Sequence, residues 1–207
     1  INAVMQLNSE DGGNRKYIMV QLPEETPEDS EARKAGYDTI PEIAKERIRR
    51  AGKKIKEESP LTTQNLDTGF RVFRLADSNF EEVKKAPAEY DQSQLDLFLN
   101  NVKSDRTDLD LLFGAILSWG VQLSLPMTSE EVDGKMIYSV NDGDLVACFA
   151  DDITENIVKA MADKQPLRVL FRDSCFARDD AKINVFETLK QLLDWSEEEA
   201  IKNIKVI

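Results

Sequence analysis

The stretch "NRKYIMVQLPEE", residues 14–25, decides how the first part of the sequence is interpreted. From Tyr17 to Leu22 it is an apolar run broken only by Gln21, and it stops at Pro23 and two carboxylates. The run is too short for a helix between these flanks and too continuously apolar for a surface strand. It therefore predicts a central strand of an α/β sheet, covered on both faces.

The segments around this strand predict more of the same sheet. Residues 1–8 have helical spacing and read as the end of a helix before a Gly-rich turn. Residues 40–58 predict a second helix, which Pro41 opens near its first turn. Residues 68–75, "TGFRVFRL", alternate large apolar side chains with arginines and predict a second strand. We thus expect residues 1–78 to form part of a Rossmann-like sheet.

The pattern changes after Ser78. A polar connector leads into two helical stretches, and the second is built on an apolar stripe of Leu109, Leu112, Phe113, Ile116, Leu117 and Val121. Residues 135–150 predict a β-hairpin around Asn141, Asp142 and Gly143, which tolerate positive φ. After the hairpin we expect a helix at 152–164, a strand at 166–173, a helix at 181–194 and a strand at 204–207. The order ββαβαβ predicts a small α/β domain at 131–207, behind a helical connector at 79–130.

Composition limits the classes of function. The 207 residues are 41% hydrophobic and 32% charged, as in an ordinary soluble domain, and contain no histidine. His-based triads, His-containing zinc sites and imidazole bases are therefore excluded. No run reaches the ~18 apolar residues of a membrane span, so we expect a cytoplasmic protein without membrane contact. The formal charge of −12 argues against autonomous binding to nucleic acid. The chain opens at Ile1 rather than Met, and we expect it to be a piece of a longer protein.

Glu24 is the first candidate for chemistry. In an open α/β sheet, ligands bind beyond the carboxyl ends of the strands, where an acid can accept hydrogen bonds from the vicinal hydroxyls of a ribose. Glu24 and Glu25, with Gln21 before them, are placed for that role. The alternative is that these acids merely open a solvated acidic loop.

Four other features have a functional and a structural interpretation. The basic residues of the 40–58 helix could follow phosphates or form its solvated face, balanced by the preceding acidic loop; they are Lys45, Arg47, Arg49, Arg50, Lys53, Lys54 and Lys56, beside the apolar Ile43, Ile48 and Ile55. Five aspartates could bind a hard cation, but helix capping is favoured; they are Asp151, Asp152, Asp173, Asp179 and Asp180. Cys148 and Cys175 read as buried reduced thiols, since no histidine could activate Cys175 as a nucleophile. Phe113 and Trp119 lie on a helix stripe and predict core or interface positions.

Long stretches of the sequence resemble one family. These are residues 3–55, which include "GGNRKYIMVQLPE", residues 68–80, "TGFRVFRLADSNF", and residues 145–176 with "KINVF" at 182–186. Together they are similar to the C-terminal part of the modification (Mod) subunit of type III restriction-modification systems. Members of that family are adenine-N6 DNA methyltransferases that use S-adenosylmethionine. The family's catalytic DPPY, its target-recognition region and its cofactor-binding FxGxG turn are not in this sequence.

The resemblance implies a role for each part of the chain. Gln21 and Glu24 match the strand-end motif and would lie near the ribose of S-adenosylmethionine, although binding without the glycine turn should be weak or absent. No catalytic residue and no metal ligand is implied, and we expect this piece to be inactive alone. The partners implied for the parent protein are DNA, a second Mod subunit and the restriction (Res) subunit.

A second hypothesis assigns the chain a purely structural task. In this interpretation the helix with Trp119 and the domain at 131–207 form an interaction module for Mod dimerisation or Res assembly. The incomplete sheet also predicts unpaired edges and an exposed apolar face on residues 16–22. We therefore expect homo-oligomers, or a packing that buries this surface.

Overall fold

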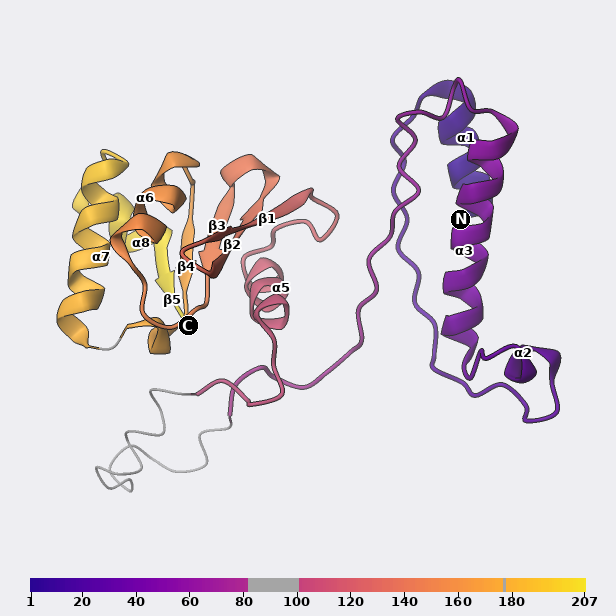
Figure 1. Cartoon of the computed structure of the whole chain (residues 1–207), viewed down its shortest axis with the longest axis horizontal. Helices are drawn as coiled ribbons and strands as arrows, with labels where there is room; N and C mark the ends of the chain where they lie inside the picture. Colours follow the sequence, from indigo (N-terminus) through magenta and orange to yellow (C-terminus); the bar gives the residue numbers. More distant parts are fainter. Residues whose placement is uncertain (82–100, 177) are drawn as a thin grey trace. The chain divides into compact units, whose positions relative to one another are not determined.

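The computed structural model describes residues 1–81, 101–176 and 178–207. They form two compact units, Ile1–Leu75 and Ala76–Ile207 (Figure 1). Residues 101–130 group with the sheet that comes after them. The functional division into 1–78, 79–130 and 131–207 stays a prediction.

The helices of Ile1–Leu75 follow the sequence pattern. Helix α1 spans Asn2–Asp11, the short α2 spans Glu31–Lys34, and α3 spans Ile40–Glu58, the range expected from the sequence, with proline in its first turn. The core of this unit is small. Met5 of α1 packs with Ile48 and Ile55 of α3, and half-buried apolar residues at both ends of the unit complete the cluster.

The two strands predicted for this unit were wrong. Residues 13–24 and 66–76 run as extended segments but belong to no strand, and the isolated bridge in this unit joins Glu25 to Thr39. The predicted burial is also absent, because Ile18 is 94% exposed and Val20 is 92% exposed. The physical reason is that a strand exists only with a hydrogen-bonded neighbour, and an apolar run does not supply one.

The two extended segments nevertheless run in the same direction along α3. Near its start, the first segment meets the second through Lys16 and Asp67, whose charged atoms are 3.1 Å apart. The first segment ends at the beginning of α3, where the Ile40 N–H donates to the Glu24 carbonyl at 2.9 Å. The second segment passes Gly52 of α3 at Thr68 and then Arg49 at Phe70. Two parallel extended segments joined through an antiparallel helix trace the backbone path of a βαβ unit.

The second unit contains a five-stranded mixed sheet. Its strands are β1 (Met127–Val132), β2 (Lys135–Val140), β3 (Leu145–Cys148), β4 (Val169–Phe171) and β5 (Ile204–Val206). They lie in the order β1-β2-β3-β4-β5, with antiparallel pairing from β1 to β3 and parallel pairing from β3 to β5. Helix α6 (Glu155–Asp163) connects β3 to β4, and helices α7 (Asp179–Leu192) and α8 (Glu197–Asn203) connect β4 to β5.

The predicted α/β class and most elements of ββαβαβ are confirmed. The hairpin turns at Asn141–Gly143, where Asn141 and Asp142 have φ near +50°, and the two helices and two strands after it are present. Strand β1 was missed because "MTSEEV" is polar, as suits an exposed sheet edge. Helix α8 was missed because it is short; its Ser196–Glu199 capping box was the signal for it.

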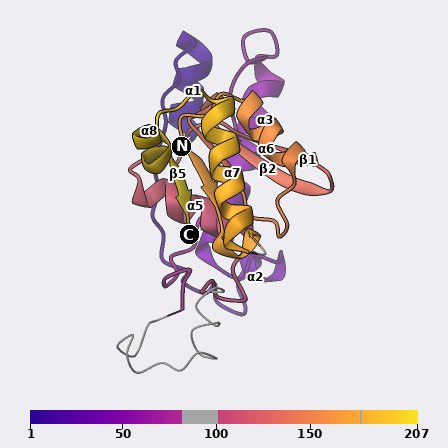
Figure 2. The same cartoon turned by 90° about the vertical axis from the view of Figure 1, so that its left-hand side faces the viewer.

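Two apolar layers cover the sheet of this unit. Helices α6, α7 and α8 pack on one face, with Phe171 and Leu189 among the buried residues. Helix α5 (Asp108–Ser118) packs on the other, with Leu112 and Leu170 buried (Figures 1 and 2). In Figure 2, α7 lies in front of the sheet. The first helical stretch predicted after Ser78 falls in residues 82–100, outside the described residues. No helix in the described ranges is long and apolar enough to cross a membrane.

Candidate functional site

Gln21 and Glu24, the predicted cofactor-binding residues, lie near the end of the first extended segment. Both are exposed, and within the described residues the Gln21 side chain donates to the neighbouring Leu22 carbonyl alone, at 3.3 Å. The side chain of Glu24 makes no hydrogen bond or ion pair with the described residues. The expected strand end is not formed here, so the structure does not bring these residues to a sheet edge. Their role toward a cofactor stays a prediction.

The surface that stands out in Ile1–Leu75 is apolar. We call it the extended face, and it consists of Ile18, Met19, Val20, Leu22, Val72, Phe73 and Leu75, each at least half exposed. In extended backbone, Ile18, Val20 and Leu22 share one side while Met19 lies on the other. Apolar side chains on both sides are typical of a strand buried within a parallel sheet. The extended face can therefore pair with a neighbouring strand, and other elements can pack over both of its sides.

A polar lock fixes the start of the extended face to α1. Asn8, only 9% exposed, donates from Nδ2 to the Arg15 carbonyl and accepts from the Arg15 N–H, each at 3.1 Å. Arg15 also binds Asp11, and this contact lowers the pKa of the Asp11 carboxyl to about 2. Gly12 provides the left-handed turn, with φ 68°, that reverses the chain.

Removing this lock should loosen the first unit. We expect Asn8→Ala to lower the free energy of unfolding of Ile1–Leu75 by about 1–3 kcal/mol, because it leaves the backbone N–H and C=O of Arg15 without their partner. Amide exchange of the α1 residues measures this loss. Gln6→Ala, which removes an exposed pair with Glu10, is the control and should change exchange little. Equal effects of the two substitutions would contradict the role of Asn8.

The basic helix α3 resembles a solvated face more than a phosphate track. Five of its seven cations are paired along the helix, with Glu42 binding Lys45 and Glu46 binding both Arg49 and Arg50. Glu57 and Glu58 face Lys53 and Lys54 in the last turn. The structural interpretation holds, but its detail was wrong, because the balancing acids lie on α3 itself and not in the preceding loop.

The aspartates at the carboxyl edge of the parallel strands are also engaged. Asp151 binds Arg172 at 2.8 Å, and Asp173 binds Lys182 at 2.6 Å. Asp179 and Asp180 lie in the first turn of α7, where their negative charge interacts favourably with the helix dipole. The residue that caps α6 is Thr154 and not Asp152. Within the described residues no group of acids or cysteines could hold a metal ion.

The two cysteines are buried free thiols, as expected. Cys175 Sγ lies 3.7 Å from the Cys148 carbonyl, and burial raises the pKa of Cys175 to about 12 and that of Cys148 in the same direction. A thiol reacts as thiolate, so this upward shift makes both inert near neutral pH. We expect a disulfide reagent at pH 8 to modify neither thiol in the native chain and both in guanidinium. Rapid native labelling would contradict this.

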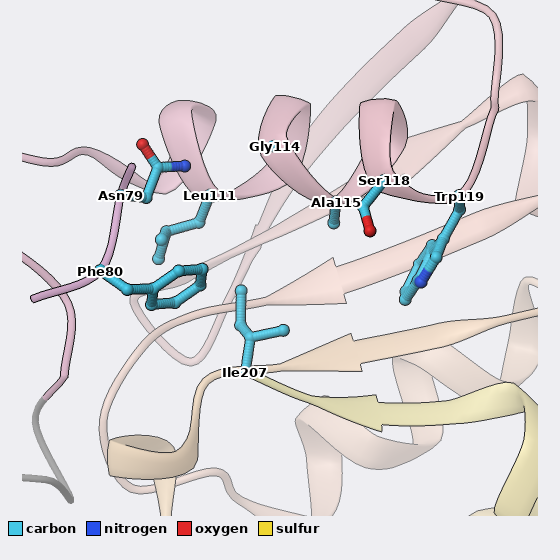
Figure 3. A pocket seen from close by; sticks show the side chains of 8 residues that line it. All are labelled: Asn79, Phe80, Leu111, Gly114, Ala115, Ser118, Trp119 and Ile207. Atoms are coloured by element: carbon cyan, nitrogen blue, oxygen red, sulfur yellow. The ribbon is translucent and has the colours of Figure 1, made fainter. Parts of the chain in front are cut away.

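A second candidate site lies beside α5. We call it the Trp119 groove; it is lined by Asn79, Phe80, Leu111, Gly114, Ala115, Ser118, Trp119 and Ile207 (Figure 3). Its volume is about 120 Å³, and that of an apolar groove between α7, α8 and β5 is about 230 Å³. Small-molecule sites usually measure about 300–1,000 Å³. Both grooves therefore suit side chains of a protein partner better than a nucleoside cofactor.

Sequence reasoning found part of the Trp119 groove and missed the rest. Trp119 and Phe113 pack partly buried against the α5 layer, as predicted. Phe80 and Ile207 were missed because they come from segments far from α5 in sequence, and no local pattern connects them.

Comparison with known proteins gives the family. No family model matches the chain. Over 190 residues the chain is 30% identical to the type III restriction-modification enzyme EcoP15I Mod subunit of Escherichia coli, an alignment that covers 84% of this chain and 26% of that protein. Over 75 residues it is 45% identical to the StyLTI Mod subunit of Salmonella typhimurium, covering 36% of this chain and 11% of that protein. The chain is a homologue of type III Mod subunits.

This result confirms the family that the sequence resembles. The chain spans about a quarter of the E. coli Mod subunit. The extended face and the Trp119 groove thus lie in a chain that aligns with about a quarter of a Mod subunit.

Proposed function

We propose that this chain is part of an adenine-N6 DNA methyltransferase, the Mod subunit of a type III restriction-modification system. In this proposal Ile1–Leu75 supplies two parallel strands and their crossover helix, α3, to the sheet that binds S-adenosylmethionine. The observation that carries it is the βαβ path of the two extended segments, whose apolar side chains face solvent on both sides. The homology to Mod subunits supports it.

Glu24 and Gln21 suit the cofactor's ribose in this proposal. The Glu24 carboxylate has no partner in the described part of the chain, so both oxygens can accept hydrogen bonds from vicinal hydroxyls. Gln21 offers an amide to the same sugar. S-adenosylmethionine supplies the methyl group when bound. The DPPY motif that holds a flipped adenine is not in these 207 residues, and we expect the chain alone to be inactive.

Calorimetric titration with S-adenosylmethionine tests this role. We expect no binding to the 207-residue chain and micromolar binding to a form extended N-terminally through the glycine turn. In the extended form, Glu24→Gln should weaken binding about tenfold, the value of one charge-assisted hydrogen bond. Glu25→Gln, one residue on, is the matched control and should have little effect. Absence of binding in both forms, or equal binding by both variants, would overturn the assignment.

A second function is proposed for Ala76–Ile207, as an interaction module for a second Mod or the Res subunit. Acidic and basic residues are equal in number in Ile1–Leu75, so the whole formal charge of −12 lies in Ala76–Ile207. Such charge disfavours DNA and favours a protein partner. Capture of purified Res by the full chain at micromolar concentration tests this, with the parent Mod as positive control. No capture under conditions where the parent binds would count against Res as partner.

A further inference from the structure

The two faces of the second unit's sheet are covered unequally. Three helices pack on one face, whereas on the other face α5 is the one helix among the described residues. The Trp119 groove lies on the α5 face, where Phe80, Trp119 and Ile207 leave half-buried apolar surface beside the helix (Figure 3). In Figure 3 the Trp119 ring lies at one end of the groove and the Phe80 ring at the other.

The Trp119 end of the groove carries positive charge that has no acidic partner among the described residues. The Arg168 guanidinium lies over the Trp119 ring, 5.9 Å from its centroid, and it is exposed. Lys205 pairs in register with Leu170, but its Nζ turns to the Ile201 carbonyl of α8, at 3.4 Å, so Arg168 is the cation that the structure places at Trp119. Arg172, two residues beyond Leu170, is neutralised by Asp151.

The acids near the opposite end are mostly engaged. Asp110 accepts from Thr107 in the capping box of α5. Asp77 binds both Lys103 and Arg106. Glu81 follows Phe80 and is exposed. The groove is therefore polarised, with free positive charge at Trp119 and negative charge at Phe80.

We propose that the Trp119 groove binds an acidic amphipathic segment of a partner protein, with a large apolar side chain against Trp119 and a carboxylate on Arg168. Arg168 can pair with a carboxylate at short range, although the net charge of −12 repels acidic chains at long range, and the apolar floor supplies the anchor. The inference deepens the proposed interaction module and rests on it.

Fluorine NMR of the full chain labelled with 5-fluorotryptophan tests the proposal. The chain has two tryptophans, and Trp195 packs on the opposite face of the sheet, so its signal is an internal control. Two synthetic helical peptides with one leucine stripe serve as probes, one with glutamates and the other with lysines around it. We expect the acidic peptide to shift the Trp119 signal and to bind about tenfold more tightly than the basic peptide, with Trp195 unmoved.

Charge reversal makes the test specific. Arg168→Glu should weaken the acidic peptide about tenfold and strengthen the basic one, and Arg168→Gln should fall between. Lys159→Glu on α6, whose cation pairs with Glu155, is the control and should change neither affinity. The proposal is overturned if the basic peptide or a single-stranded oligonucleotide binds preferentially, or if Arg168→Glu leaves the preference unchanged. Cofactor binding is assigned to Ile1–Leu75, so neither result bears on that proposal, which the titration with S-adenosylmethionine tests.

Discussion

Leu112→Ala is expected to lower the free energy of unfolding of Ala76–Ile207 by about 3 kcal/mol. Leu112 is fully buried between α5 and the sheet, and truncating such a side chain removes its transfer free energy and leaves a cavity. Among the described residues, no second helix lies on this face that could shift to fill the space. Guanidinium unfolding followed by tryptophan fluorescence measures the loss.

The same helix offers a matched control. Leu117 lies one and a half turns later and is 62% exposed, so Leu117→Ala should cost less than about 1 kcal/mol. A similar loss for both substitutions would show that α5 does not pack on the sheet as described.

The second large effect is expected from replacing Ile18, Val20 and Leu22 together by serine. In the 207-residue chain these side chains are exposed, and we expect the free energy of unfolding to change by less than about 0.5 kcal/mol. In a full-length Mod polypeptide carrying this sequence, the proposed sheet buries them. Burial of each is worth about 1.5–3 kcal/mol, so the triple variant should lose at least about 4 kcal/mol.

Thermal unfolding of both proteins, with and without the substitutions, measures this difference. The control is a second triple variant, with serine in place of Thr62, Gln64 and Asn65. These side chains are polar and exposed in the loop after α3, so the control should change the stability of either protein little. A full-length protein that tolerates the triple variant would show that the extended face is not a buried strand.

The helices were predictable from the sequence because their hydrogen bonds join residues four apart. The bounds of α3 follow from Pro41, the apolar spacing of Ile48 and Ile55, and the polar end of the repeat. The segment 16–22 shows the limit of the same reasoning. Its apolar pattern indicates the buried environment that the segment prefers. The pattern does not encode the neighbouring strand that would supply hydrogen bonds, and residues 16–22 form no strand here.

The candidate sites show the same limit. Gln21 and Glu24 were selected because a strand end would place them at a ligand, and without the strand that argument rests on the proposed parent sheet. The Trp119 groove combines residues from the segment before α5, from α5 itself and from the end of β5. Arg168 acquires its place through the register of β4 with β3, which starts at Val169 and Val146. Such sites depend on long-range packing and are not visible in a local stretch.

The contact between Gly52 and Thr68 has a consequence for the order of assembly. A methyl group on Gly52 would lie 2.9 Å from the Thr68 side chain, so glycine lets the second extended segment begin tightly against α3. The segment is held at this end, whereas Leu75 at its far end is exposed. A partner strand would therefore meet a segment that has one end already positioned. We expect the hydrogen bonds between the two to form in sequence, from Thr68 toward Leu75.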